Sequence, residues 1–370
     1  MRPGQPWMAR EGEALGDGDG ERSGDEGWDR SRAVTCREES REARGEAGCL
    51  WKGERSGGVA SVHPVPLTWS ADLLHSRHGQ KRPRAVSRIM RRFLPAFALP
   101  LLAACSAAGV LNGITPSSTF DRTKNVSYGD HARAVMDIYR ADTPRADAPG
   151  LVFVHGGSWS EGDKGIYKFL AEGFTKEGFD VVVPNYRLYP EARYPDMVVD
   201  TGRAAAAAAR ELGRDVVLIG HSAGGYNALM AAMAPDVSGL DVCATVAGLI
   251  SLAAPTGAYP LTDEPFVTIF PERFGGADAP VNRVEGARLP PVMLVNGLDD
   301  TTVGPKNVEV LGDAMEARGL RVERKLYPGM NHVDAVRVLS RHFDGDSPLK
   351  GDMIRFIDAL DAGRADHCAR

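Results

Sequence analysis

Between residues 151 and 318 the chain alternates short apolar runs with helical patterns. The runs are bounded mostly by Gly, Pro or charged residues, and they cover Leu151–Val154, Val181–Val183, Val216–Ile219, Val242–Leu249 and Val292–Val295. Short uninterrupted apolar runs suit parallel strands that are buried on both faces. The helical patterns lie at Lys168–Lys176, Val198–Leu212, Ala223–Met233 and Val308–Arg318. This alternation predicts the α/β class, with a mostly parallel central sheet covered by helices on both faces.

Further elements complete one catalytic domain, expected over residues 124–365. Asn125–Ser127 and Arg133–Tyr139 are predicted as two early strands, and Arg321–Leu326 as a late one. A last helix carries Met353, Phe356, Ile357 and Leu360 at helical spacing, so one of its faces should dock on the core.

One interval, near 253–288, breaks the alternation. It is rich in Pro and Gly and carries Phe266, Phe270 and Phe274, spaced four apart. It is too long for a simple connection, so we expect a small cap insertion over the mouth of the sheet. The three phenylalanines either wall the acyl pocket or anchor the cap to the core.

Residues 1–89 do not have the pattern of a domain. They hold 15 Lys+Arg, 14 Asp+Glu and 13 Gly, and they lack apolar periodicity. Such a segment cannot bury enough surface to offset its ordering entropy. Two interpretations remain: a disordered arm, or a mis-annotated upstream extension with translation starting at Met90, which we favour.

Residues 90–104 have the layout of a secretory signal peptide. Arg91 and Arg92 precede an uncharged run that is too short to span a bilayer. The run ends in Leu102-Ala103-Ala104-Cys105, which resembles the bacterial lipobox. The resemblance implies that Cys105 is lipidated and that the protein is anchored to a membrane in the cell envelope, on the periplasmic or outer side. Residues 105–123 would then form a linker.

The charge and cysteine counts exclude other classes. The net charge is −5, and from residue 105 onward 35 Asp+Glu stand against 27 Lys+Arg, so no nucleic-acid partner is expected. The five cysteines do not form a disulfide framework or a metal-ligand spacing. Cys243 is predicted to be a buried strand residue, and a Cys243–Cys368 bridge is the less favoured alternative.

The chemistry converges on Ser222. The apolar run Val216–Ile219 leads directly into Gly220-His221-Ser222-Ala223-Gly224, and a helical pattern follows. This G-x-S-x-G motif between a strand and a helix predicts a strained turn that exposes the serine hydroxyl. A serine needs a base, and the base needs an orienting carboxylate.

Downstream loops supply both partners. His332 follows a predicted strand and is the candidate base, whereas other histidines do not follow a strand in this order. For the acid we favour Asp300 over Asp299, because Gly297 to Val303 resembles the spacing usual in a fold of this kind, in which the fourth residue turns inward. The predicted catalytic set is therefore Ser222, His332 and Asp300.

An oxyanion hole is expected where Leu151–Val154 runs into His155-Gly156-Gly157-Ser158-Trp159. The glycines let backbone N–H groups approach the substrate. The predicted donors are the N–H groups of Gly157 and Ala223, with Ser158 as a third candidate. Structural support of the site is assigned to a further set, namely His155, Gly156, Trp159, Gly220 and Gly224.

With these motifs the chain resembles the α/β-hydrolase superfamily. More narrowly, it resembles the BD-FAE-like esterases related to hormone-sensitive lipase and to feruloyl and acetylxylan esterases. The residues that carry the resemblance are His155–Trp159, Gly162–Lys164, Tyr186–Leu188 with Pro190, Pro195 and Asp200, Gly220–Gly225, Gly297–Val303 and His332. The resemblance implies the α/β-hydrolase fold, with Tyr186–Asp200 as a structural belt in which Arg187 and Asp200 pair.

The expected activity is that of a serine carboxylesterase that hydrolyses short-chain or aromatic acyl esters through an acyl-enzyme. A small-molecule ester is the expected substrate, and no cofactor or metal is required. Three alternatives remain: an arylformamidase similar to kynurenine formamidase, a peptidase, and a non-catalytic binding lipoprotein of the envelope.

Overall fold

A single eight-stranded sheet forms the centre of the computed structural model, which describes residues 107–360. In the sheet the strands run in the order β1-β2-β4-β3-β5-β6-β7-β8. The two pairings β1·β2 and β2·β4 are antiparallel, and the others are parallel. The bounds are β1 Phe120–Ser127, β2 Val135–Ala141, β3 Gly150–Val154, β4 Val181–Pro184, β5 Val216–His221, β6 Val246–Leu252, β7 Val292–Gly297 and β8 Val322–Tyr327.

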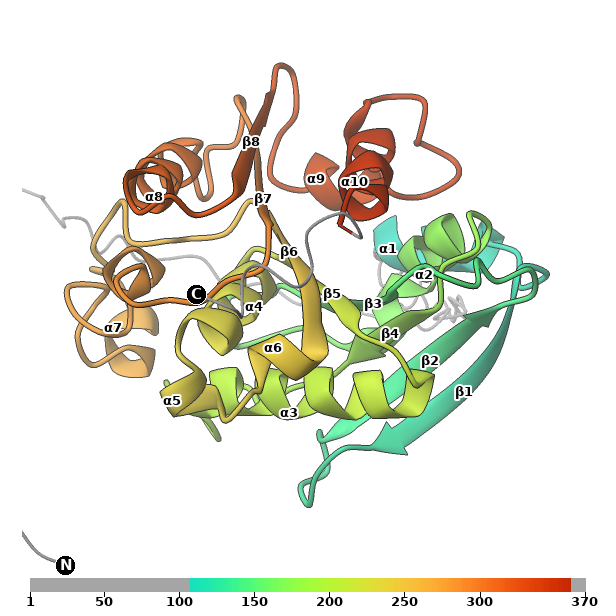
Figure 1. The fold of residues 1–370 in the computed structure, drawn as a ribbon, viewed down its shortest axis with the longest axis horizontal. Coiled ribbons are helices and arrows are strands. Elements are labelled where there is room, and N and C mark those ends of the chain that lie inside the picture. Colours follow the sequence, from blue (N-terminus) through green and yellow to red (C-terminus); the bar gives the residue numbers. More distant parts are fainter. Residues whose placement is uncertain (1–106, 361–370) are drawn as a thin grey trace, which may run out of the picture. The chain divides into compact units, whose positions relative to one another are not determined.

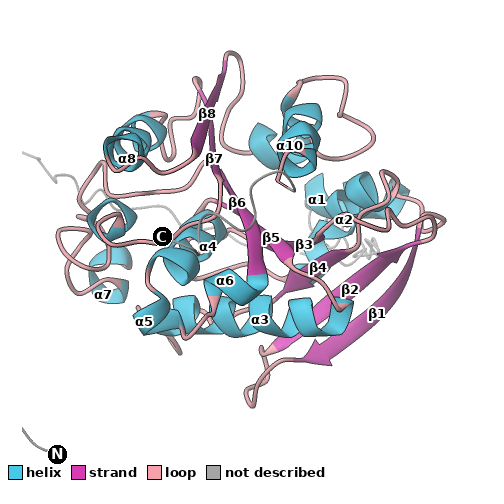
Figure 2. Ribbon diagram, viewed as in Figure 1, coloured by secondary structure: helices cyan, strands magenta, loops and turns pink. Residues whose placement is uncertain are grey.

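Helices cover both faces of this sheet (Figures 1 and 2). On one face the core is built with α3 (Asp196–Leu212), α4 (Ala223–Met233) and α8 (Lys306–Ala317). On the other it is built with α1 (Ala107–Ile114), α2 (Lys168–Thr175), α9 (Asp334–Arg337) and α10 (Leu349–Asp358). The short elements are η2 Lys164–Tyr167, α5 Pro235–Ser238, α6 Val242–Thr245, α7 Phe266–Ile269 and η3 Pro280–Arg283. The predicted layered architecture is confirmed.

The strands are buried because the sheet is covered on both sides. All residues of β3, β5, β6 and β7 are buried. Parallel strands end at a common edge, and the carboxyl ends of β3, β5, β7 and β8 lead into the loops that carry the predicted site residues. The sheet therefore gathers residues from positions 155 to 332 at one edge.

Three predicted elements are wrong in their bounds. The strand predicted at Asn125–Ser127 begins at Phe120 and is β1. The linker predicted at residues 105–123 instead contains α1 and the start of β1. The strand predicted from Val242 begins only at Val246, because Asp241 caps a helical turn by accepting a hydrogen bond from the Ala244 N–H at 3.1 Å. Cys243 is consequently exposed on that turn and not in a buried strand; it is disulfide-bonded, and a pairing with Cys368 lies outside the described residues.

Where the cap is predicted, the chain makes an excursion between β6 and β7 with α7 and η3 as its regular elements. The four-residue spacing of its phenylalanines does not produce a continuous helix, since α7 ends at Ile269 and Pro271 follows Phe270. Phe270 and Phe274 are buried in the core, and Phe266 is half-buried against it.

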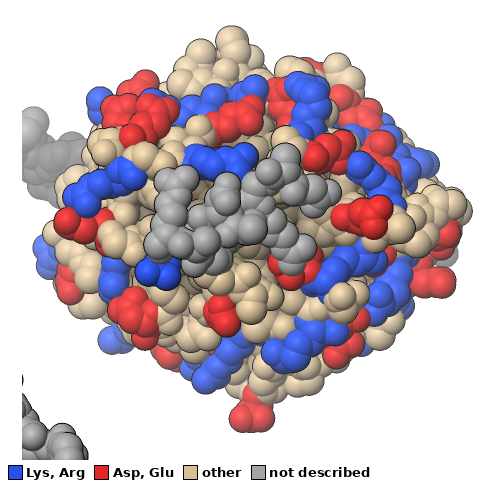
Figure 3. Space-filling view, viewed as in Figure 1, with Lys and Arg blue, Asp and Glu red and all other residues tan. Residues whose placement is uncertain are grey.

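Several predictions concern residues outside the described range. These are the upstream extension 1–89, the signal peptide 90–104 and the lipidation of Cys105. Within residues 107–360, no helix has the length and apolar character needed to cross a bilayer. On the face shown in Figure 3, acidic and basic side chains are interspersed.

Candidate active site

Ser222 occupies a strained turn between β5 and α4. Its backbone angles are φ 54° and ψ −124°, a conformation that costs a non-glycine residue about 1–3 kcal/mol. The Ser222 N–H donates to the Leu252 carbonyl at 2.9 Å, and its own carbonyl accepts the Tyr226 N–H at 3.1 Å. These bonds tie the turn to β6 on one side and to α4 on the other.

The glycines around Ser222 are required by close backbone approaches. A Cβ on Gly224 would collide with the carbonyl oxygens of Val154 and His155, and one on Gly220 would collide with the Gly224 backbone. The start of α4 therefore lies directly against the end of β3. Ala223, the first residue of α4, is the chain neighbour of this contact.

Asp300 and His332 are brought together from the ends of β7 and β8. His332 Nδ1 donates to Asp300 Oδ2 at 2.8 Å, and the Asp300 side chain is fully buried. Asp299 is exposed on the same loop. The geometry thus pairs His332 with the carboxylate that the sequence favoured.

The Asp300 carboxylate is held in its ionised form. Burial alone would raise its pKa, but hydrogen bonds from the backbone N–H of Val303 and from His332, with a further one from Thr302, bring the pKa below its ordinary value. The Thr302 and Val303 N–H groups donate to Oδ1 at 2.8 and 3.0 Å. Because Oδ2 accepts from Nδ1, Nε2 of a neutral His332 is left as a proton acceptor.

His221, which precedes Ser222, contacts His332 directly. Its Nε2 donates to the His332 carbonyl oxygen at 2.9 Å, and the two rings lie 4.8 Å apart. Burial, followed by the proximity of His332, lowers the pKa of His221 to about 3, so the ring is neutral. Sequence reasoning did not single out His221. Its position directly before Ser222 was the sequence feature that could have indicated a role in the site.

Three consecutive positive φ values shape the loop after β3. They are 120° at Gly157, 51° at Ser158 and 56° at Trp159. Ser158 is exposed, whereas Gly156 lies so close to the turn that a Cβ there would be 3.1 Å from the Ser222 Cβ. The predicted oxyanion loop therefore lies beside the predicted nucleophile.

Trp159 anchors this loop to α4. Its Nε1 donates to Asn227 Oδ1 at 3.0 Å, and its ring is buried edge-on against Tyr226 and Phe270. Asn227 was not predicted, and its place inside an apolar helix gave no sequence signal for this role.

His155, predicted as a structural support, lies at the start of the loop that follows β3. It is fully buried, its Nδ1 lies 2.8 Å from the Gly156 carbonyl, and its ring stacks on Tyr186 at 4.5 Å. Burial lowers its pKa to about 4. The Tyr186 hydroxyl donates to the His155 carbonyl at 2.9 Å, which links the belt to this loop.

The belt carries the predicted ion pair. Arg187 binds both carboxylate oxygens of Asp200 at 2.9 Å, and its backbone N–H donates to the same group at 3.0 Å. Asp200 is fully buried, and His131 Nε2 lies 3.2 Å from it. These contacts fix the segment between β4 and α3 and do not involve Ser222, Asp300 or His332.

Most of the comparisons with known proteins point to ester hydrolases. Residues 136–252 match the BD-FAE family model. The probable isoprenylcysteine alpha-carbonyl methylesterase ICME of Oryza sativa subsp. japonica is 26% identical over 269 residues, which cover 65% of this chain and 64% of that protein. The probable carboxylic ester hydrolase LipM of Mycobacterium tuberculosis is 36% identical over 124 residues, 30% of this chain and 28% of LipM.

Solved structures share the fold. Esterase B from Lactobacillus rhamnosis superposes with a TM-score of 0.59 at 19% identity, over 72% of this chain and 95% of the other. A truncated carbohydrate esterase from gut microbiota superposes with a TM-score of 0.55 at 17% identity, over 66% of this chain and 98% of the other. The chain spans 56–64% of the length of the first two curated relatives, both methylesterases. The chain therefore has the α/β-hydrolase fold and is related to carboxylic ester hydrolases.

Proposed function

We propose that the protein is a serine carboxylesterase in which Ser222 is the nucleophile, His332 the general base and Asp300 the orienting acid. The single observation that carries the proposal is the 2.8 Å hydrogen bond from His332 Nδ1 to the buried Asp300. This bond selects the tautomer whose Nε2 can take a proton. The strained Ser222 turn beside the His221–His332 contact supplies the hydroxyl.

The reaction proceeds in two halves. Ser222 Oγ attacks the ester carbonyl while His332 Nε2 takes the hydroxyl proton, and the N–H groups of Gly157 and Ala223, with Ser158 as a third candidate, stabilise the oxyanion. Collapse breaks the bond to the alcohol oxygen, which receives the proton from His332. A water deprotonated by His332 then releases the carboxylic acid and restores Ser222.

We propose short-chain or aromatic acyl groups as the substrates. The cap between β6 and β7 is compact, because Phe270 and Phe274 are packed into the core with Tyr226. Its helical elements are the two four-residue turns α7 and η3, and it lacks a long apolar lid helix within the described residues. Such a cap favours acetyl to butyryl groups over long acyl chains.

The test combines labelling with kinetics. A fluorophosphonate should label Ser222, and Ser222→Ala should abolish both labelling and hydrolysis while leaving thermal unfolding nearly unchanged. Across p-nitrophenyl esters, kcat/KM should peak at four acyl carbons or fewer. Full activity in Ser222→Ala would refute the nucleophile, and an optimum at eight carbons or more would refute the short-chain proposal.

Arylformamide hydrolysis is the second candidate, since the same three groups would serve it. The kynurenine formamidase of Salmo salar is 24% identical over 246 residues, covering 63% of this chain and 81% of that protein. N-formylkynurenine and phenyl acetate, compared at equal enzyme concentration, separate the two activities. A kcat/KM higher for the formamide would favour the amidase.

We also propose that Cys105 is lipidated and anchors the protein in the bacterial envelope. The support is the lipobox-like sequence Leu102–Cys105 after an uncharged run. Membrane fractionation with mass spectrometry of the mature N-terminus tests this, and Cys105→Ser should release the protein or block its processing. Wild-type protein found soluble with an unmodified Cys105 would refute the anchor.

A further inference from the structure

An apolar cavity of about 400 Å³ lies on the α1 and α2 side of the sheet. That volume is within the range of about 300–1,000 Å³ typical of small-molecule sites. Its lining comes from α1, from η2 and α2, from the end of β5 and from the chain after His332. The lining residues used below are Val110, Ile114, Tyr167, His221, Val333 and Phe343.

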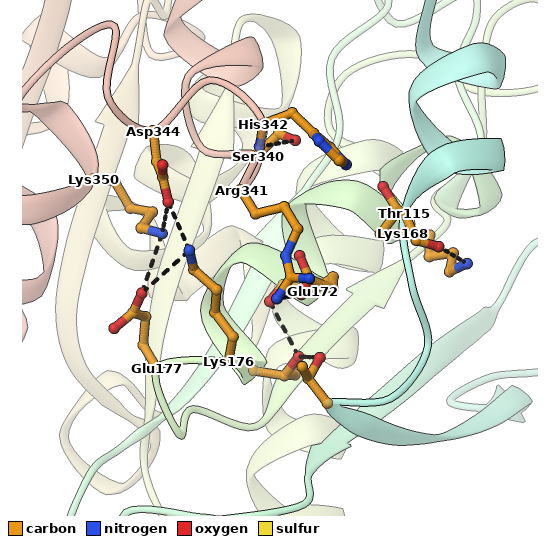
Figure 4. Close-up of polar contacts among 12 residues, drawn as sticks. Thr115, Lys168, Glu172, Lys176, Glu177, Ser340, Arg341, His342, Asp344 and Lys350 are labelled. Carbon is orange, nitrogen blue, oxygen red and sulfur yellow. Dashed lines mark hydrogen bonds and ion pairs between the residues drawn. The ribbon is translucent and has the colours of Figure 1, made fainter.

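Polar contacts fix the α1 wall of this cavity. The Asn112 side chain donates to the Gly165 carbonyl at 2.9 Å and accepts the Phe169 N–H at 3.0 Å. Lys168 Nζ donates to the Thr115 carbonyl at 2.6 Å, a contact drawn in Figure 4. An eight-residue helix outside the sheet is thereby held in place against η2 and α2.

The facing wall is fixed by ion pairs. Phe343 belongs to this wall, and in the sequence Arg341 and Asp344 flank it. Arg341 contacts the buried Glu172 at 2.8 Å, and Asp344 contacts Lys176 and Lys350 at 2.7 Å each (Figure 4). These contacts bind the loop before α10 to α2.

The same loop is held from the catalytic side as well. The Arg337 guanidinium lies over the Phe343 ring at 4.5 Å. Its charge is matched by Asp334 and Asp346, each at 2.8 Å. Arg337 lines the cavity, but its charge is already paired, so the walls are suited to an apolar occupant.

Exposed apolar side chains concentrate at this cavity. Among the described residues five large apolar side chains are exposed, and three of them, Val110, Ile114 and Val333, line it at 53%, 59% and 67% exposure. The other two are Tyr259 and Leu298. Besides Arg337, the lining contains the polar side chain of His221, whose Nε2 is already bonded to the His332 carbonyl. The cavity offers apolar contact with few free polar partners.

Two lining residues link the cavity to the proposed catalytic residues along the chain. His221 and Val333, which line it, are the chain neighbours of Ser222 and His332. In the proposed reaction His332 protonates the departing alkoxide, so the alcohol part of the ester must lie on the His332 side of Ser222. The acyl part extends to the other side.

We propose that this cavity binds an apolar alcohol portion of the substrate, so that the protein prefers esters of alkyl or arylalkyl alcohols. The inference rests on the proposed esterase function and adds the class of leaving group. Each methylene buried there is worth up to about a fourfold gain in kcat/KM. The acyl preference is governed separately by the cap.

The experiment compares acetate esters of increasing alcohol length, from ethyl to n-hexyl, by following acetate release. We expect n-hexyl acetate to exceed ethyl acetate in kcat/KM by at least about tenfold. Ile114→Asp and Val110→Asp, which place a charge in the α1 wall, should reduce that ratio below about threefold by lowering n-hexyl acetate turnover more than ethyl acetate turnover.

Tyr259→Asp is the matched control, because Tyr259 is an exposed apolar residue that does not line the cavity. It should retain the wild-type ratio. If the enzyme hydrolyses esters and is labelled by the fluorophosphonate at Ser222, but kcat/KM does not change with alcohol length, this inference alone is overturned. Absence of both hydrolysis and labelling would overturn the proposed function with it.

Two further outcomes would also overturn the inference. One is an equal loss for all esters in the α1 variants, which would indicate a structural role for α1. The other is a change of oligomeric state in Ile114→Asp, measured by light scattering, with an unchanged alcohol ratio. That result would assign the apolar surface to a second copy of the chain.

Discussion

His221 Nε2 lies 2.9 Å from the backbone carbonyl oxygen of His332. The residue before the proposed nucleophile thus holds the main chain of the proposed base. Because the pKa of His221 is lowered to about 3, the ring remains a neutral donor at every pH at which an esterase would work. The end of β5 and the loop after β8 are joined at the point where the reaction would occur.

Removing this hydrogen bond should impair the enzyme without removing a catalytic group. His221→Phe leaves the His332 carbonyl without its donor, which costs about 1–3 kcal/mol of unfolding free energy. We expect kcat to fall more than KM rises, since the base loses its position. His221→Gln, which can still donate, should recover part of kcat; equal activity in all three proteins would contradict the role.

Substitution of the neighbouring residues Asp299 and Asp300 should have very different effects on kcat. Asp300→Asn removes the acceptor that selects the His332 tautomer, and a loss of kcat on the order of 10⁴-fold is expected from such a change in a serine triad. Asp299 is exposed and makes no hydrogen bond to His332, so Asp299→Asn is the matched control and should stay within about twofold of the wild type. A reversed order in steady-state kinetics would assign the acid to Asp299.

Stability should fall as the pH is lowered from 6.5 toward 4. His155 titrates near 4 in the folded protein, against 6.5 as its ordinary value, so in this window the unfolded chain binds the extra proton. The free energy of unfolding should decrease by up to about 1.4 kcal/mol per pH unit for this group. Urea unfolding at pH 7, 6 and 5 measures the slope.

Comparison with His155→Gln isolates the contribution of that imidazole. In the variant, the slope of the free energy of unfolding against pH should correspond to the uptake of about one proton fewer on unfolding, whatever the stability of the variant at pH 7. His221, lowered to about 3, contributes a parallel loss that the variant retains. An unchanged slope in His155→Gln would show that His155 does not carry the effect.

Phe270 should act as an anchor of the cap. It is fully buried, with ring centroids 4.7 Å from Trp159 and 4.9 Å from Phe274. Phe270→Ala should cost about 3–5 kcal/mol of unfolding free energy, measured by urea unfolding. The other possibility, an acyl-pocket wall, would instead move the p-nitrophenyl ester optimum to longer chains at nearly constant stability. Tyr259→Ala, at an exposed position of the cap, is the stability control.

Local sequence patterns were sufficient for most strands of the sheet and for the loop that carries the proposed acid. The apolar runs at Leu151–Val154 and Val292–Val295 lie within β3 and β7, because strands buried on both faces need apolar residues throughout. The spacing from Gly297 correctly placed Asp300 in the interior and Asp299 at the surface.

Features that depend on tertiary contacts could not be predicted. The helix α1 is held by Asn112 and Lys168, whose partners are more than 50 residues away in sequence. The hydrogen bond from His221 joins residues 111 positions apart. At Val242, a local cap by Asp241 prevailed over an apolar run that indicated a strand.

The hydrogen bond from Trp159 to Asn227 has a consequence for thermal motion. It connects the loop bearing Gly157 to the helix that begins at Ala223, so the two proposed oxyanion donors are linked to each other and to Ser222. The Trp159 ring also packs on Phe270 of the cap, with the ring centroids 4.7 Å apart. We therefore expect a movement of the cap to reach both proposed donors through Trp159.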